Sequence, residues 1–513
     1  MARHTGTDAQ QLEALMEQKL LCIHHALPRP PVSAAARLAL APPRDGDDGP
    51  DRLSALPDAL LADIVSRLPA KDAARTAALS RRWRPVWRAA PLALADTHLL
   101  PAGARDAFPV RLTRADSRAA AAAAVSAALA SHPGPFPSVR LTCCRVEAAA
   151  DRAELARWLQ HLAVKGVGEL FLICRPSPLA APPLPPTFFS MPALTRLYLG
   201  LCKFPDTAGL PRGAAFPCLR ELRLCGVAIA RRDVDAVLAR SPVLEVLCFQ
   251  SHSASSLRLR LVSRSLRSVQ IHFSSLDSVD VVDAPRLERL IVSGNVNDCG
   301  HVKIGHAPAL RIFGYVEPEK AVLQVGATII KAGTMVNPRT MVPTVKILAL
   351  QLRFGVRNDA KMLISVLKCF PNVERLHIHS KKTTESTGRL NLKFWRDSGA
   401  IECIQSHINV MSLHDFRGER NELAFLKFFI DSAQMLNMMV IVFAKGCLRS
   451  FSDADKVKNL FSGKNATEGC TLHVCESAFP EGGGVWDYNR GSESCCGPFA
   501  FGRSSSCIMQ CSV

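Results

Sequence analysis

The sequence predicts an α/β fold in which a small three-helix segment is followed by a solenoid of short parallel strands and a strand–helix–strand cap. Three observations support this prediction. Residues 51–92 carry apolar side chains at helical spacing, an apolar pattern recurs between residues 167 and 378, and residues 400–475 contain one strand–helix–strand pattern. A chain of 513 residues is long enough for such a composite architecture.

Both ends of the chain are expected to lie outside the folded core. Residues 1–50 hold one possible helix at 8–25 and then a Pro-, Ala- and Asp-rich stretch, which cannot bury enough apolar surface to offset its ordering entropy. We therefore predict a disordered N-terminal tail. Residues 476–513 are rich in Gly, Ser and Cys, and we predict a flexible tail there.

The first two helices of the segment at residues 51–98 have clear sequence boundaries. Pro57 stands at the start of the first helix, in which Leu60, Ile64 and Leu68 recur at four-residue spacing, and Pro69 ends it. A second helix follows at once and runs to the Ala-rich turn that precedes the third.

The third helix of this segment contains an unusual proline. Ser80 is a suitable N-cap, and Trp83 and Trp87 lie four residues apart on one face. Pro85 falls inside the helix, where we expect it to remove one backbone hydrogen bond and distort the helix locally. Because the whole segment is too short to bury a proper core, we expect it to complete that core on a partner.

The chain then passes through a connector into a repeated pattern. Residues 99–135 form the connector, with an Ala-rich helix at Asp116–Ser131. An L-x-x-L-x-L pattern follows, at intervals of 27, 25, 25, 22, 21, 23, 35 and 28 residues. Its copies begin at Val167, Leu194, Leu219, Leu244, Leu266, Leu287, Leu310, Val345 and Val373.

Nine copies at a period near 20–29 residues are the signature of a leucine-rich-repeat solenoid, which we place at residues 136–399. Each copy supplies one strand of a concave parallel sheet, and segments such as 231–240 and 359–370 supply convex helices or turns. The usual Asn of the repeat is mostly absent, so we expect an irregular solenoid. Residues 400–475 are expected to cap it with a strand, a helix at 420–435 and a strand at 436–443.

The concave face is the candidate surface for a ligand. In each copy the third, fifth and seventh positions point away from the leucine core, and they are polar or basic near the ends of the array and more apolar in its middle. Such a surface suits a protein or peptide ligand, unless loops or the cap cover its apolar part. The candidate residues are Arg196, Tyr198, Arg223, Gln250, Gln270, His272, Arg289, Arg375 and His377.

Residues 51–92 closely resemble the F-box, through Leu56-Pro57, Leu68-Pro69 and Leu79-Ser80-Arg81-Arg82-Trp83. The order F-box, irregular leucine-rich repeats, then a C-terminal unit with Phe416-Arg-Gly is similar to the plant F-box/LRR proteins with an FBD-like C-terminal domain. The resemblance implies a substrate receptor of a cullin–RING (SCF-type) ubiquitin ligase, whose F-box docks on a Skp-type adaptor and whose repeats hold a protein target for degradation. The adaptor-contacting positions that it implies are Leu56, Pro57, Leu60, Ile64, Leu68, Leu79, Ser80, Trp83 and Trp87.

Two alternatives to this function remain open at the level of sequence. One is a leucine-rich-repeat scaffold whose F-box is degenerate and unused, for which Pro85 is the best argument. The other is nucleic-acid binding, suggested by a net charge of +18, although the arginines are scattered and the densest run is Arg75–Arg88. We expect neither a nucleic-acid nor a membrane partner.

The sequence shows no motif typical of catalysis or of a cofactor. Phosphate-binding loops, dinucleotide fingerprints and zinc-protease motifs are missing, and the pair Cys470 and Cys475 with His473 between them is a poor match to zinc-ligand spacing. We therefore expect no enzyme activity, metal or cofactor. The 18 cysteines, without a secretory signal, suggest reduced thiols and a location in the nucleus or cytoplasm.

Overall fold

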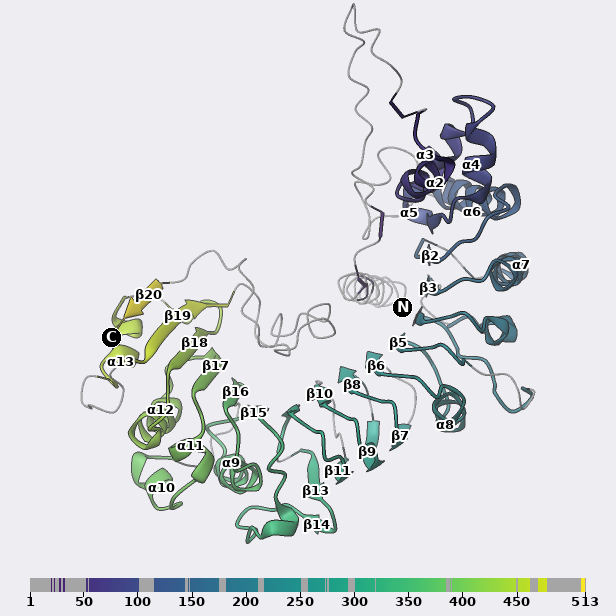
Figure 1. Ribbon diagram of the computed structural model, residues 1–513. Helices are drawn as coiled ribbons and strands as arrows, with labels where there is room; N and C mark the ends of the chain where they lie inside the picture. The colour runs from purple at the N-terminus through teal and green to yellow at the C-terminus, as the bar shows by residue number, and fades with distance from the viewer. Residues whose placement is uncertain are drawn as a thin grey trace, which may run out of the picture. The chain divides into compact units, whose positions relative to one another are not determined.

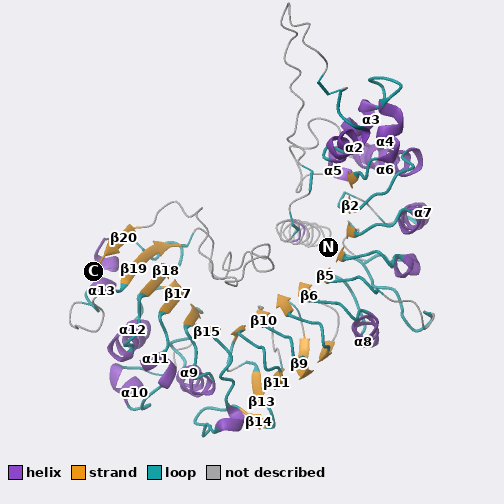
Figure 2. Ribbon diagram, in the orientation of Figure 1, coloured by secondary structure: helices purple, strands orange, loops and turns teal. Residues whose placement is uncertain are grey.

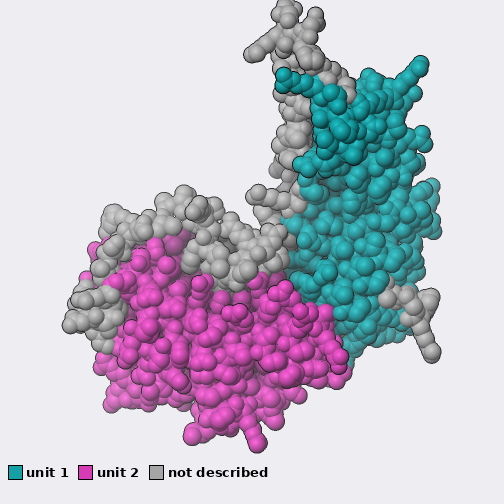
Figure 3. Space-filling model, in the orientation of Figure 1, with its two compact units in different colours: residues 1–254 teal, residues 255–513 magenta. Residues whose placement is uncertain are grey.

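A computed structural model describes residues 52–100, 115–174, 181–210, 216–250, 257–293, 300–383, 388–461, 469–477 and 509–512, apart from a few single positions inside these ranges, together with residues 20, 23, 27, 28, 31 and 32. The chain divides into two units, Met1–Ala254 and Ser255–Val513 (Figure 3).

The N-terminal helical segment has the three predicted helices. They are α2 (Asp58–Ser66), α3 (Ala70–Thr76) and α4 (Trp83–Ala89). Pro57 and Pro69 occupy the N-cap positions of α2 and α3, where a residue without an N–H costs no helical hydrogen bond. Leu61, Val65 and Val86 are buried and form the small core of the segment.

Pro85 does not disturb α4, contrary to the prediction. The helix begins at Trp83, so Pro85 is its third residue, and the amide groups of the first turn have no acceptor within a helix. No helical hydrogen bond is therefore lost. The sequence prediction was wrong because it began the helix at Ser80, whose carbonyl instead accepts a separate turn bond from the Trp83 amide at 3.2 Å.

The repeats of the first unit form a parallel sheet in chain order, with helices on its outer side (Figures 1 and 2). The strands are β1 (Ala93–Ala95), β2 (Ser138–Leu141), β3 (Glu169–Ile173), β4 (Arg196–Gly200), β5 (Glu221–Cys225) and β6 (Val246–Gln250). The helices are α5 (Asp96–Leu99), α6 (Ala115–Ser131), α7 (Ala149–Val164), the short 3-10 helix η1 (Pro186–Ser190) and α8 (Arg231–Arg240). The predicted helices of the connector and of residues 231–240 are thus confirmed.

The leucines of successive repeats align in one buried row. Leu170 pairs with Leu197, which pairs with Leu222 and then with Leu247, and all four are at most 2% exposed. Stacking each strand on the next therefore buries one continuous apolar core, as a solenoid requires.

The second unit continues the pattern of parallel strands in chain order. Its strands, in order, are β8 (Ser268–His272), β10 (Arg289–Ser293), β12 (Ile312–Val316), β15 (Ile347–Leu352), β16 (Arg375–Ser380), β17 (Val410–Phe416), β18 (Met438–Phe443) and β19 (Thr471–Glu476), followed by the antiparallel β20 (Met509–Ser512). All nine predicted repeat strands are present across the two units. Its helices are α9 (Arg357–Cys369), α10 (Leu392–Arg396), α11 (Glu402–Ser406), α12 (Arg420–Ser432), α13 (Phe451–Lys458) and the 3-10 helix η2 (Pro338–Thr340).

A second sheet occupies the convex side between residues 257 and 329, where helices or turns were predicted. It consists of β7 (Leu257–Val262), β9 (Leu276–Asp283), β11 (His301–His306), β13 (Val322–Val325) and β14 (Thr328–Ile329). The repeats that hold β7, β9 and β11 are only 22, 21 and 23 residues long, which leaves too little chain for a helix and two turns, and β13 and β14 extend this sheet within the longer repeat that follows. The alternation in Leu257–Val262, with every second residue buried, was the signal for a strand.

The cap has the predicted strand–helix–strand order in β17, α12 and β18. Gly418 lies between β17 and α12 with a φ of +72°, which favours glycine. Glu422 at the start of α12 accepts hydrogen bonds from the amides of Arg417 and Glu419 at 3.0 and 2.9 Å, which closes the helix terminus.

Both chain ends are less separate from the core than predicted. Ile23 and Val32 are buried, at 3% and 4% exposed, within the stretch expected to be disordered. Residues 509–512, expected to lie in a flexible tail, pair with β19. The rest of the possible helix at 8–25 lies outside the described residues, apart from helical positions 20 and 23.

Candidate functional site

The helical segment presents apolar side chains that its own core does not use. Leu60 on α2 is 51% exposed and Leu79, after α3, is 65% exposed, whereas their neighbours Leu61 and Val65 are fully buried. The remaining predicted docking residues on this segment are exposed or half-buried: Leu56, Pro57, Ile64, Leu68 and Ser80. A segment with a closed core and outward leucines has the form of a docking module.

Trp83 is a correction to the predicted docking face, and Trp87 packs partly against the connector. Trp83 is only 8% exposed and belongs to the core of the segment. Trp87 is half-buried, and its ring lies 5.1 Å from the ring of His132, which in turn contacts the Ala90 carbonyl at 3.0 Å. The two tryptophans lie on one face of α4, as their spacing predicts, but this face packs inward. Trp83 enters the core of the segment, and Trp87 lies beside His132 of the connector.

The arginine run borders the docking face. Arg82 binds Asp58 at 2.8 Å and Arg75 binds Asp72 at 2.8 Å, so these two arginines are partly neutralised within the segment. Further positive charge comes from the exposed residues Arg81, Arg84 and Arg88. An acidic partner would meet complementary charge beside the exposed leucines.

The concave face of the first unit carries a row of stacked aromatic and guanidinium groups. The Arg140 guanidinium lies 4.1 Å above the ring of Phe171, which lies 4.6 Å from the ring of Tyr198. At the other end of the row, the guanidinium of Arg223 lies 5.3 Å from the centre of the Tyr198 ring. Successive strands bring these side chains together because Arg140, Phe171, Tyr198 and Arg223 are direct partners in the register of β2 to β5.

Glu221 links the charges of this row. It accepts hydrogen bonds from the Tyr198 hydroxyl and from Arg223 Nε, both at 2.7 Å, and lies 3.5 Å from Arg196 Nε. Burial raises the pKa of Tyr198 above its usual value, so the phenol stays protonated and donates. The network holds Tyr198 and Arg223 in fixed positions, at 6% exposed each, while Arg196 remains exposed at the rim.

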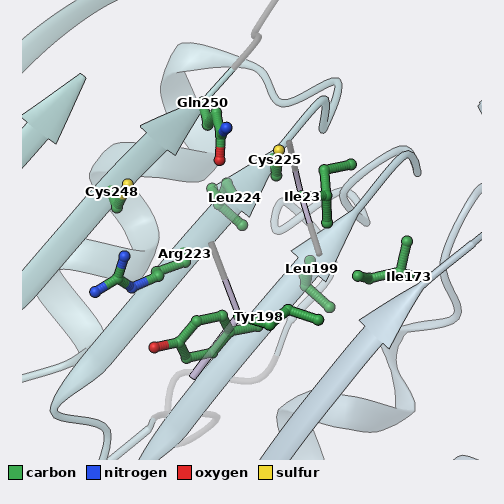
Figure 4. Close-up of a pocket in the computed structure, with 10 residues that line it drawn as sticks. Ile23, Ile173, Tyr198, Leu199, Arg223, Leu224, Cys225, Cys248 and Gln250 are labelled. Carbon is green, nitrogen blue, oxygen red and sulfur yellow. The ribbon is translucent and has the colours of Figure 1, made fainter. Parts of the chain in front are cut away.

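A neighbouring row on the same face forms a small apolar pocket. Ile173, Gly200, Cys225 and Gln250 are successive register partners. Ile173, Cys225 and Gln250 line the pocket, together with Tyr198 and Arg223 (Figure 4). Ile23 from the N-terminal stretch enters this pocket (Figure 4). Within the described part of the chain, Gln250 Nε2 is buried without a hydrogen-bond partner.

The predicted residues of the second unit are mostly buried rather than open to a ligand. Gln270, His272 and His377 are 1%, 0% and 3% exposed, whereas Arg289 and Arg375 remain half-exposed. An apolar cluster of buried concave residues lies beside them: Ile291, Ile312, Tyr315, Ile347 and Ala349. The predicted apolar middle of the face is present, and its side chains are buried.

Histidines on β16 and β17 make the second unit sensitive to acid. Burial lowers the pKa of His377, and it lowers the pKa of His414 to about 4. Between that value and the usual 6.5 the unfolded chain binds more protons than the folded chain, so stability falls as the pH falls through this window.

We expect protonation of His414 to lower the free energy of unfolding of this unit by about 1–3 kcal/mol between pH 7 and pH 4, and protonation of His377 to lower it further. Thermal unfolding followed across this pH range measures the effect. His414→Gln should flatten the pH profile, while the same change at His306, whose side chain is 64% exposed, should leave it unchanged. Equal profiles for the wild-type chain and His414→Gln would contradict the assignment.

Sequence reasoning missed some partners of the site. Phe171 occupies the fifth position of the first repeat, equivalent to Tyr198, and was not among the predicted residues. Ser412, which hydrogen-bonds His377 Nδ1, and Asp415, 3.1 Å from His379 Nε2, lie on β17, outside the repeats considered. The register between β16 and β17 was the information needed to find them.

Neither a metal site nor a membrane span is evident in the described part of the chain. Among these residues no group of three His, Cys, Asp or Glu side chains could hold a metal ion. Similarly, none of the helices in the described ranges is long and apolar enough to cross a membrane.

Family comparisons match three successive parts of the chain. The F-box domain model matches residues 53–92, the model for the LRR repeats of the FBD-associated F-box protein At5g56370 matches residues 155–378, and the FBD model matches residues 396–441. These three stretches contain the docking segment, most of the repeat strands and the start of the cap.

Relatives from Arabidopsis thaliana extend along most of the chain. The F-box/FBD/LRR-repeat protein At1g13570 is 24% identical over 411 residues, which are 77% of this chain and 91% of that protein. The F-box/LRR-repeat protein At2g42730 is 22% identical over 471 residues, 83% of this chain and 98% of that protein. The MEIOTIC F-BOX protein MOF of Oryza sativa subsp. japonica is 34% identical, but over only 113 residues, 22% of this chain and 23% of that protein. With an F-box, leucine-rich repeats and an FBD domain in this order, the chain belongs to the plant F-box/LRR proteins that carry an FBD domain.

Proposed function

We propose that this chain is the substrate-recognition subunit of a cullin–RING (SCF-type) ubiquitin ligase. Its F-box binds a Skp-type adaptor, and its repeats bind a protein target that is then ubiquitylated and degraded. The observation that carries the proposal is the pair of outward leucines, Leu60 and Leu79, on a module whose own core is already closed.

Adaptor binding would use apolar contact at the centre of the face and charge at its border. Burying two exposed leucines against a partner contributes about 1.5–3 kcal/mol each. The exposed arginines Arg81, Arg84 and Arg88 would add electrostatic attraction to an acidic adaptor, which affects mainly the association rate.

Target binding would use the concave face of the first unit. Its central side chains, Tyr198 and Arg223, are held by Glu221, so a target would meet a rigid surface with little entropy to lose. Tyr and Arg are the residue types that most often dominate binding energy at protein interfaces. Arg196, exposed at the rim, supplies a charge that a target can contact directly.

This role is that of an adaptor and requires no chemistry from the chain itself. Ubiquitin transfer would take place on the other subunits of the ligase. The rival function, a repeat scaffold with an unused F-box, loses its best argument because Pro85 costs α4 no hydrogen bond.

The direct test is binding of the purified full chain to a purified Skp-type adaptor. We expect a stable one-to-one complex in size-exclusion chromatography, with an association rate that falls as salt rises. If the adaptor and the chain elute separately at micromolar concentrations while the chain melts cooperatively, the scaffold function is correct and the ligase function is wrong.

Targets can be captured with a variant that binds them without delivering them to the ligase. The double variant Leu60→Asp/Leu79→Asp serves as the first bait in cells, and the same variant with Tyr198→Ala added serves as the second. We expect targets of the concave face to be enriched by the first bait and lost from the second. Proteins retained by both baits bind elsewhere on the chain and do not support the concave-face site.

A further inference from the structure

A stretch near the N-terminus already occupies the proposed target site. Leu20, Ile23 and Leu27 follow the i, i+3, i+7 spacing of one helix face, and positions 20 and 23 are helical. Ile23 packs against Ile173, Leu201 and Cys225, and Leu20 and Leu27 are partly buried against the same cluster.

The same stretch makes a polar contact beyond its helical part. Arg140 Nη1 donates a hydrogen bond to the Pro28 carbonyl at 2.7 Å, and Arg140 is the guanidinium that stacks on Phe171. Val32 is buried as well, at 4% exposed. The described residues of this stretch therefore contact both rows of the concave face, the apolar row through Ile23 and the aromatic row through the Pro28 carbonyl, which Arg140 binds.

The fit of this stretch to the face is incomplete. Gln250 lines the same pocket, is 3% exposed and keeps its Nε2 without a hydrogen-bond partner among the described residues. A buried donor without an acceptor weakens the bound state, so a ligand that offers an acceptor at this point would bind better.

We propose that residues 20–32 are an intramolecular ligand of the concave face, displaced when a protein target binds there. The target would present an amphipathic helix with aliphatic side chains at the spacing of Leu20, Ile23 and Leu27, and an acceptor for Gln250. This proposal rests on the target-binding role of the repeats and adds to it both the kind of target segment and its competition with the chain's own N-terminus.

Attachment to the same chain explains how a weak ligand can keep the site occupied. A tethered segment acts at an effective concentration on the order of millimolar. Consider a free peptide with the sequence of this segment that binds the empty site with a dissociation constant of about 100 μM. Its apparent affinity for the intact chain would be about tenfold lower, because the tethered segment competes for the same site. A variant whose tethered segment no longer occupies the site should therefore bind the free peptide about tenfold more tightly than the wild type does.

The experiment uses a fluorescein-labelled peptide of residues 16–34 and fluorescence anisotropy with three full-length chains. These are the wild type, Ile23→Glu, and Pro31→Glu as the matched control, since Pro31 is exposed. We expect Ile23→Glu to bind the peptide at least tenfold more tightly than either other chain. A peptide that itself carries Ile23→Glu should bind none of them.

Two results would overturn the proposal. One is equal binding of the peptide by wild type and Ile23→Glu, or no binding by Ile23→Glu while its cooperative melting is retained. The other is loss of cooperative melting both in Ile23→Glu and in the milder Leu27→Glu, which would make the stretch a permanent part of the fold. If only Ile23→Glu fails to fold, the tenfold comparison is made with Leu27→Glu. No adaptor is present, so the outcome is independent of the F-box test.

Discussion

Replacing Leu60 and Leu79 together by aspartate is expected to weaken binding to a Skp-type adaptor by about 100-fold or more. Each leucine is more than half exposed in the free chain, so each would lose about 1.5–3 kcal/mol of apolar burial on binding. A loss of about 3 kcal/mol corresponds to about two orders of magnitude in the dissociation constant. The added negative charge would also repel an acidic adaptor. Isothermal titration calorimetry with the purified full chain measures the effect.

The control for this experiment is Val164→Asp, an equally severe change at an exposed apolar residue outside the F-box. Val164 is 89% exposed at the end of α7. Val164→Asp should leave the affinity for the adaptor unchanged. The double variant should melt at the same temperature as the wild type, because exposed side chains contribute little to the core. Retained affinity in the double variant would place the docking face elsewhere or show that the F-box is unused.

Trp83→Ala is a poor substitute for these variants, although the sequence favours it. Trp83 is buried in the F-box, and truncating a buried tryptophan costs about 3–5 kcal/mol of stability. That loss exceeds what a small three-helix module can tolerate. Adaptor binding would disappear because the module unfolds, and the result would not identify a contact.

The strands of the fold could be predicted because each repeats a local pattern. L-x-x-L-x-L specifies a short strand with two inward residues, preceded by a third buried apolar residue, and one copy predicts the next. The convex side has no such repetition. Its segments β7, β9 and β11 form strands where the repeats are short, so the spacing of the repeats decides their structure together with the local alternation of buried residues.

The site was harder to predict because burial depends on what lies over a surface. The rule that places Tyr198, Arg223 and His377 on the concave face is correct, yet all three are nearly buried. For Tyr198 and Arg223 part of the reason is the N-terminal stretch, whose Ile23 and Leu27 line the same pocket. The composition of residues 1–50 predicted disorder for that stretch. The surface on which it packs lies more than 100 residues away in the sequence, and no local pattern in the stretch indicates it.

Truncation of Trp395 is expected to have the largest effect on the stability of the second unit. The side chain is 1% exposed on α10, with its ring 5.0 Å from Phe425 and 6.0 Å from Phe428, both on α12. Trp395→Ala should cost about 3–5 kcal/mol and lower the melting temperature of this unit by about 10 °C. Differential scanning calorimetry measures both quantities.

The neighbouring residue supplies the control, because it is aromatic, on the same short helix, and only half-buried. Phe394 lies 5.2 Å from Trp395 and carries Arg357 over its ring at 5.5 Å, but much less of it is removed from solvent. Phe394→Ala should therefore cost about 1 kcal/mol. Equal effects at the two positions would mean that α10 is not packed on α12 by Trp395. A large effect at Trp395 alone would show that this ring packs α10 on α12, the helix of the cap, and that the packing supports the end of the solenoid, whose core would be exposed without a cap.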